Sequence, residues 1–176
     1  KYVFEDMNGK IDMIVDGGQS EVGVESTVVT LAQKPARLLR PGGITAEQLK
    51  SVLGEVIIDD AVLHMLKSGE KAASPGMKYK HYAPKADVTI VKGSFDAFRR
   101  FVAEKGDCFV LCFEGEEKYF KNYVTYGRAD DPSSQANRLF DALRELDEKG
   151  AKTVYARDPG TSGVDLAVYN PLIPAA

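Results

Sequence analysis

The sequence predicts an α/β fold whose second half forms a small, open and mostly parallel β-sheet. Over residues 86–176, apolar runs of strand length alternate with longer runs of helical period, which is typical of parallel strands joined by crossover helices. The run Cys108–Phe113 is almost entirely apolar, as expected for a strand buried on both faces. The length of 176 residues fits one large domain or two small ones.

Residues 1–70 are expected to be β-rich with one helix. Thr45 and Gln48 have the spacing of a capping box, so a helix should begin there and bury Leu49, Val52 and Leu53. Because about 70 residues bury only a marginal core, this segment suggests the C-terminal part of a larger α/β domain. The other expected elements are strands at 10–15, 23–31, 36–39 and 56–58, with a turn at 33–35 that makes a hairpin, and a helical turn at 61–66.

Residues 86–176 are predicted to contain four strands and three helices. Ser94 can cap a helix that places Phe95, Phe98, Phe101 and Val102 on one face. The longest helix is expected at 133–149, and a short last helix at 163–170 should end before Pro171. The expected strands lie at 87–91, 108–113, 119–126 and 153–156.

Composition narrows the class of function. A net charge of −3 argues against a protein that binds nucleic acid through bulk positive charge. No apolar run reaches the roughly 18 residues that a membrane span needs.

Cys108 and Cys112 are expected on one strand face as reduced thiols, without a disulfide or a metal site. No nucleotide-loop, zinc or nucleophile motif is visible, so no catalytic side chain and no metal ligand is predicted.

The connector SPGMKYKHYAP, residues 74–84, carries chemical groups that a plain linker lacks. Pro75 and Gly76 exclude a helix interior or a central strand. Lys78 is a cation that suits a phosphate, and His81 and Tyr82 can stack on or hydrogen-bond a base or ribose. The alternative is a solvated hinge, which would explain the lysines but not the aromatic residues. We therefore expect a loop that contributes ligand-binding residues here.

Two further sites combine polar side chains with glycines. Ser26 and Thr27 follow Gly23 at the start of an expected strand, where small hydroxyls can donate to a carboxylate or phosphate; ordinary strand residues are the alternative. Arg40 precedes Pro41 and a pair of glycines, so its guanidinium can reach an anionic ligand with two parallel N–H groups. A surface ion pair is the alternative for Arg40.

Three strings, in this order, resemble the long, two-domain form of threonylcarbamoyl-AMP synthase: GVESTVV at 23–29, LLRPGGIT at 38–45, and the connector SPGMKYKHYAP. That family has a YrdC-like catalytic domain, a linker and a small Rossmann-like domain. The resemblance implies that residues 1–70 are the C-terminal part of the YrdC-like domain. It makes 71–85 an active-site linker and 86–176 the Rossmann-like domain.

The resemblance also implies an activity. The family condenses L-threonine, bicarbonate and ATP, with Mg²⁺, into threonylcarbamoyl-AMP and pyrophosphate. The product supplies the threonylcarbamoyladenosine of tRNA through downstream transfer proteins, so a cytoplasmic nucleotidyltransferase is expected, with no membrane partner. Carried over to this chain, Ser26 and Thr27 would bind L-threonine. Arg40 and Tyr82 would bind ATP, and His81 and Lys78 would lie beside it on the linker.

Two departures from the family pattern affect this expectation. The family's N-terminal half, with its basic pair for the triphosphate, does not match any part of this chain, so we expect the polypeptide alone to be inactive. The family's Asn-Arg-Leu ending reads Asn170-Pro171-Leu172 here. The alternative functions are a non-catalytic RNA-binding module, with RNA as its partner, and a regulatory domain that binds a small ligand at its strand ends.

Overall fold

A computed structural model describes residues 1–64 and 84–173 and contains two separate β-sheets. The three-stranded sheet has the order β1-β2-β3, and the four-stranded sheet has the order β4-β7-β5-β6. The α/β class predicted from the alternation of patterns is confirmed. The predicted linker at 71–85 lies outside the described residues, apart from its last two positions.

The first sheet is a hairpin with one added strand. β1 (Val28–Thr30) pairs antiparallel with β2 (Ala36–Arg40), and β3 (Val56–Ile58) pairs parallel with β2. The core of this sheet contains Leu38, Val56 and, from α3 (Asp60–Leu63), Val62. The predicted hairpin and the short third strand are confirmed.

Three details of this first part differ from prediction. Residues 10–15 form no strand, because no neighbouring strand pairs with them, and Val15 is 84% exposed. The strand expected at 23–31 is limited to β1, because residues 23–27 pack against the turn after β2 and against a helix. In α2 (Ala46–Leu53) the capping box is present, but Val52 is 83% exposed and Leu53 is 40% exposed. Ala46 and Leu49 make this helix's contact with the core instead.

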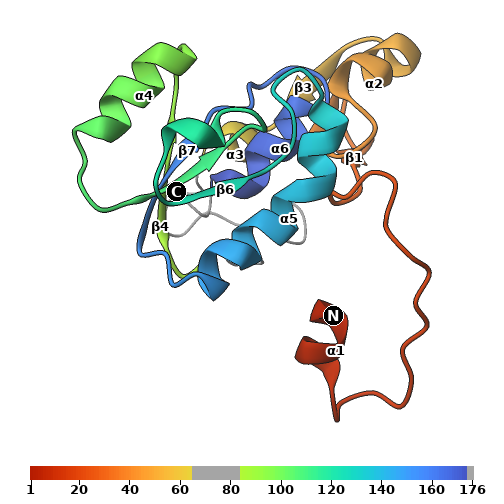
Figure 1. Ribbon diagram of the computed structural model, residues 1–176. Coiled ribbons are helices and arrows are strands. Elements are labelled where there is room, and N and C mark those ends of the chain that lie inside the picture. Colours follow the sequence, from red (N-terminus) through yellow and green to blue (C-terminus); the bar gives the residue numbers. More distant parts are fainter. Residues whose placement is uncertain (65–83, 174–176) are drawn as a thin grey trace.

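The second sheet is parallel throughout. Its strands are β4 (Asp87–Val91), β5 (Phe109–Cys112), β6 (Tyr123–Thr125) and β7 (Thr153–Arg157). Helices α5 (Pro132–Glu148) and α6 (Asp165–Leu172) cover one face, and α4 (Phe95–Ala103) covers the other (Figure 1). This is the three-layer arrangement that alternating strands and helices favour.

Two predicted boundaries in the second part are wrong. The strand expected at 119–126 begins only at Tyr123, because η1 (Glu117–Tyr119) is a single 3₁₀ turn. Helix α6 continues through Pro171 to Leu172. A proline in the last turn removes only one backbone hydrogen bond, and the fully buried Leu172 holds the helix end in the core.

Helix α6 joins the two parts of the molecule, which are the first part, residues 1–64 with the three-stranded sheet, and the second part, residues 84–173 with the four-stranded sheet. Leu166 packs into the core of the first sheet, whereas Val168 and Leu172 pack into the core of the second. The side-chain amide of Asn170 donates to the carbonyl of Val62 at 2.9 Å. These contacts fix the first sheet against the second through apolar packing and a hydrogen bond.

The N-terminal segment also lies against the second part. Helix α1 (Tyr2–Met7) contacts α5 through ion pairs from Lys1 to Glu148 and from Arg144 to Asp6. A Cβ added to Gly23 would lie 2.4 Å from the Cα of Asn137, so the chain passes α5 closely enough to require glycine there. Within residues 1–64 and 84–173, no helix is both long and apolar enough to span a lipid bilayer.

Candidate functional site

Arg40 lies at the end of β2 and binds the segment before β1. Its Nε–H donates to the carbonyl oxygen of Ser26 and its Nη2–H donates to the Ser26 hydroxyl, both at 2.9 Å. Its Nη1 makes an ion pair with the Glu25 carboxylate at 2.7 Å. We call Glu25, Ser26, Thr27 and Arg40 the polar cluster. The Arg40 guanidinium is thus held in one orientation by two neighbouring residues.

The turn that follows Arg40 is clamped onto the same segment. The Thr27 hydroxyl donates to the carbonyl of Ile44 at 2.7 Å and accepts from the Ile44 N–H at 3.1 Å. A Cβ at Gly42 would lie 2.3 Å from the Glu25 carbonyl oxygen and 2.4 Å from the Thr27 nitrogen. Only glycine leaves room for this approach. The Pro-Gly-Gly sequence after Arg40 therefore turns the chain and also lets its backbone pack against residues 25–27.

The structure brings together three of the predicted site residues. Ser26, Thr27 and Arg40 are adjacent, although 14 positions separate Ser26 from Arg40. Ser26 is exposed, whereas the Arg40 side chain is only 16% exposed. Lys78, His81 and Tyr82 lie outside the described residues. The ion pair that sequence reasoning gave as the alternative for Arg40 is present too, with Glu25 as the partner.

Sequence reasoning missed Glu25. Its carboxylate is part of the polar cluster, but a negatively charged side chain is not expected to bind an anion, so Glu25 was not predicted as a site residue. The sequence feature that could have indicated it is the string Glu25-Ser26-Thr27, in which three polar side chains directly precede a β-branched run. A strand of this length places such residues near the end of its hairpin partner, where Arg40 lies.

Two family models match the chain, and the boundary between the matches lies within the first sheet, between β2 and β3. Residues 44–176 match the family described as threonylcarbamoyl-AMP synthase, C-terminal domain. Residues 1–42 match the family described as telomere recombination. The first match covers more than half of the chain.

The chain belongs to the threonylcarbamoyl-AMP synthase C-terminal domain family. Three similar curated proteins carry the name threonylcarbamoyl-AMP synthase. The Pyrococcus abyssi protein is 41% identical over 97% of this chain, the Bacillus subtilis protein 40% over the whole chain, and the Schizosaccharomyces pombe protein 32% over the whole chain. The chain spans about half the length of these relatives, between 48% and 52%.

Solved structures of a threonylcarbamoyl-AMP synthase relative show the same fold. The crystal structure of Pyrococcus abyssi Sua5 in complex with L-threonine matches with a TM-score of 0.84 at 39% identity, over 98% of this chain and 52% of that protein. A variant of the same protein, in which an adjacent His–Tyr pair is replaced by alanines, matches equally well over 51% of its length. The predicted Rossmann-like C-terminal domain is confirmed.

The described residues of this family member offer no metal centre. Among residues 1–64 and 84–173, no group of three or more His, Cys, Asp and Glu side chains could hold a metal ion. Glu25, the carboxylate in the polar cluster, is already paired with Arg40. The described part of the chain therefore does not fit a resident metal.

The Rossmann-like part carries a separate buried ion pair at the carboxyl ends of its strands. Arg157, the last residue of β7, donates to Glu116, and both side chains are nearly buried, at 12% and 13% exposed. Burial raises the pKa of the Glu116 carboxyl, and the Arg157 charge only partly opposes this. Arg157 also donates to the carbonyl of Gly93 after β4. These contacts connect the loops at this edge of the sheet, which is where open α/β sheets commonly bind ligands.

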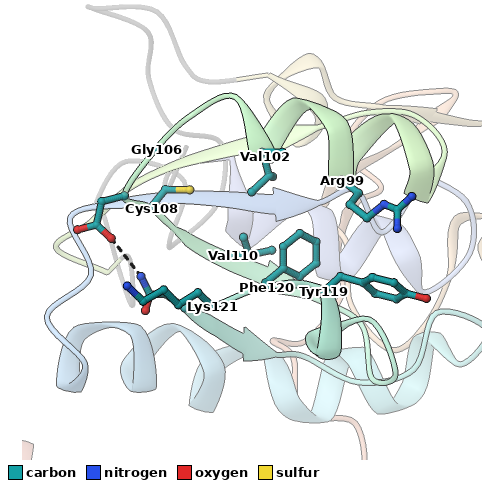
Figure 2. A pocket seen from close by; sticks show the side chains of 11 residues that line it. Arg99, Val102, Gly106, Cys108, Val110, Tyr119, Phe120 and Lys121 are labelled. Atoms are coloured by element: carbon teal, nitrogen blue, oxygen red, sulfur yellow. Dashed lines mark hydrogen bonds between the residues drawn. The ribbon is translucent and has the colours of Figure 1, made fainter.

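A hollow of about 490 Å³ lies elsewhere on this part, between α4, the start of β5, and the η1 turn (Figure 2). Its apolar floor contains Val102, Val110 and Phe120, and charged side chains lie on its rim. It does not include any residue of the polar cluster.

Proposed function

We propose that this protein is the C-terminal portion of a threonylcarbamoyl-AMP synthase. The reaction joins L-threonine, bicarbonate and ATP into threonylcarbamoyl-AMP, with release of pyrophosphate and water. The observation that carries the proposal is the hydrogen bond from Arg40 to the exposed Ser26 hydroxyl, in a chain 41% identical to a protein of that name. The L-threonine complex of the Pyrococcus abyssi relative supports threonine as one ligand.

The hydrogen bond determines what the Ser26 hydroxyl can do. Since its oxygen accepts from Arg40, its own proton points elsewhere and can be donated to an anion. The carboxylate of L-threonine is such an acceptor, and a hydroxyl bound to a cation is a stronger donor. We therefore assign Ser26 to the threonine site. Thr27, whose hydroxyl is engaged with Ile44, supports that site by holding the turn.

Arg40 supplies positive charge for the nucleotide. In the proposed reaction, an oxygen of the threonine carbamate attacks the α-phosphate of ATP and the bond to pyrophosphate breaks. Negative charge then accumulates on the phosphates, and a fixed guanidinium stabilises it without reorganisation. Positioning and charge are sufficient for such a step, which agrees with the absence of a nucleophile motif in the sequence. Magnesium would enter with ATP.

The connector residues Lys78, His81 and Tyr82 complete the proposed ATP site. They lie outside the described residues, so their assignment depends on the sequence. The solved variant of the Pyrococcus abyssi relative has an adjacent His–Tyr pair replaced, and this chain has such a pair at His81–Tyr82. A linker that closes over the site would exclude water from a carbamate and a mixed anhydride, both of which hydrolyse readily. We place this chemistry in the cytoplasm, ahead of transfer to tRNA.

The experiment is an activity assay on a fusion protein. This chain is joined behind the N-terminal half of the Bacillus subtilis relative, which is 40% identical over this chain, and pyrophosphate release is measured with and without L-threonine. We expect threonine-dependent release that falls about a hundredfold or more in Ser26→Ala and Arg40→Ala. Release that is unchanged in both variants would contradict the proposed site.

Two controls accompany this assay. Arg37→Ala removes another arginine of β2 that pairs with Asp59 outside the polar cluster, and it should leave the threonine dependence intact. The isolated chain should release no pyrophosphate, and robust turnover by it would show that this portion is sufficient alone. Circular dichroism establishes that each variant is folded.

A further inference from the structure

We propose that the hollow beside α4 is a second ligand site, which binds a small anion with a planar ring, about the size of a mononucleotide. Its volume of about 490 Å³ falls within the range of small-molecule sites, roughly 300–1,000 Å³. It lies in the Rossmann-like part and shares no residue with the polar cluster. The inference therefore does not depend on the proposed synthase activity.

The hollow exists because one face of the sheet is incompletely covered. The connection from β5 to β6 contains one 3₁₀ turn, η1, in its ten residues rather than a crossover helix. Helix α4 lies over the neighbouring strands and buries Val102 and Phe98 there. A hollow with apolar and polar lining residues therefore remains between α4 and η1.

The floor is suited to a flat apolar group. Val102 of α4 points toward Val110 of β5 and the ring of Phe120, and these three side chains form the middle of the hollow (Figure 2). Val102 and Val110 are buried, and Phe120 is half-buried. A ring that enters the hollow would contact chiefly the half-buried Phe120, since Val102 and Val110 are only 8% and 1% exposed. Aromatic contacts of this kind contribute affinity in such sites.

Two cations lie at opposite ends of this floor. At one end, the Arg99 guanidinium lies 5.2 Å from the centre of the Tyr119 ring. At the other, Lys121 lies on the same side as Cys108 (Figure 2). The carboxylate of Asp107 accepts from Asn122 at 3.2 Å, and Asp96 pairs with Arg99 at 3.5 Å while 76% exposed. An ion pair that exposed is weak, so a phosphate or carboxylate can replace it.

The test is an NMR titration of this chain with adenosine monophosphate as the probe. We expect saturable shifts of the amides of Val110 and Phe120. Adenosine, which lacks the charge, and ribose 5-phosphate, which lacks the ring, should each bind at least about tenfold more weakly. Equal binding by either fragment would overturn the assignment of ligand class. No saturable shift at about 10 mM probe would overturn the site itself.

Matched variants on one helix locate the binding. Ala103→Trp fills the hollow from its rim, whereas Ala97→Trp places the same ring on α4 outside it. Arg99→Gln removes a rim cation, and Arg100→Gln removes its neighbour outside the hollow. We expect the affinity for adenosine monophosphate to fall about tenfold or more in Ala103→Trp and in Arg99→Gln. It should stay unchanged in Ala97→Trp and in Arg100→Gln. Equal losses within a pair would overturn the proposal.

Cys108 gives an independent readout, since it lines the hollow and Cys112 is buried. Bound probe should slow alkylation of Cys108 and leave the rate unchanged in Ala103→Trp. Arg40→Gln should not alter the probe's effect. If it abolishes that effect, the probe binds at the polar cluster, and the second site is refuted while the proposed synthase site stands.

Discussion

The carboxylate of Glu25 lies 2.7 Å from Nη1 of Arg40, so it offsets part of the charge that a triphosphate would meet. Glu25→Gln keeps the shape and a hydrogen-bond acceptor but removes this negative charge. We expect the KM for ATP in the fusion protein to fall about two- to tenfold, because repulsion between the carboxylate and the phosphates disappears. Steady-state kinetics would measure this, with the exposed Glu55→Gln as a control. A higher KM for ATP would show that Glu25 acts mainly by orienting Arg40.

The two cysteines should differ in reactivity. Burial raises the pKa of the Cys112 thiol to about 12, so about one molecule in ten thousand carries the thiolate at pH 8. Cys108 is half-buried, and burial raises its pKa as well. We expect iodoacetamide to modify Cys108 slowly and Cys112 not at all in the folded protein, as read by mass spectrometry. Modification of both at one rate would contradict the burial of β5.

At the scale of elements, β7 is tied to the neighbouring loops by the ion pair between Arg157 and Glu116. Burial raises the pKa of Glu116 above its ordinary value of 4.5, so the folded state holds this proton more tightly than the unfolded chain does. The stability that Glu116 contributes is therefore fully present below about pH 4.5 and is lost as the pH rises through the raised pKa.

Glu116→Gln tests this pH dependence. The variant resembles the protonated acid at every pH. The free energy of unfolding of the unmodified protein, relative to the variant, should therefore fall as the pH rises through the raised pKa of Glu116. Urea unfolding at several pH values measures the difference. A relative gain in stability with rising pH would mean that the Arg157 charge outweighs burial and lowers the pKa.

Elements were predictable where the local sequence alone specifies them. Two helices have both a capping residue and a helical spacing of apolar residues: the helix capped by Thr45 and Gln48, and the helix capped by Ser94. Strand β5 is marked by its continuous apolar run. The errors concern packing that the local pattern does not contain. Residues 10–15 have a strand-like composition but no partner strand, and Val52 lies on a helical face that nothing in the described structure covers.

The candidate site was only partly predictable for the same reason. Ser26 and Arg40 were chosen separately, from their glycine-rich surroundings, and only the hairpin register places them in contact. The contact between Thr27 and Ile44 depends on the turn at Gly42, whose path no sequence pattern specifies. The hollow beside α4 results from a connection that contains a 3₁₀ turn instead of a crossover helix. It was not foreseen because a strand was expected to begin at Tyr119, the last residue of η1.

At the scale of the whole molecule, α6 and α5 hold the first sheet against the Rossmann-like part. Leu166 and Asn170 of α6 contact the first sheet and α3, and Asn137 of α5 donates to the carbonyl of Glu21 at 3.0 Å. The polar cluster therefore rests on a framework to which both parts contribute. We propose that Ser26 and Arg40 act as one hydrogen-bonded unit that holds both substrates.

The most direct measurement of that unit is the KM for L-threonine in the fusion protein carrying Arg40→Gln, at saturating ATP. We expect this KM to rise together with the KM for ATP, because the substitution removes the donor that orients the Ser26 hydroxyl. If the KM for L-threonine stays at the unmodified value while the KM for ATP rises, Ser26 and Arg40 do not act as one unit.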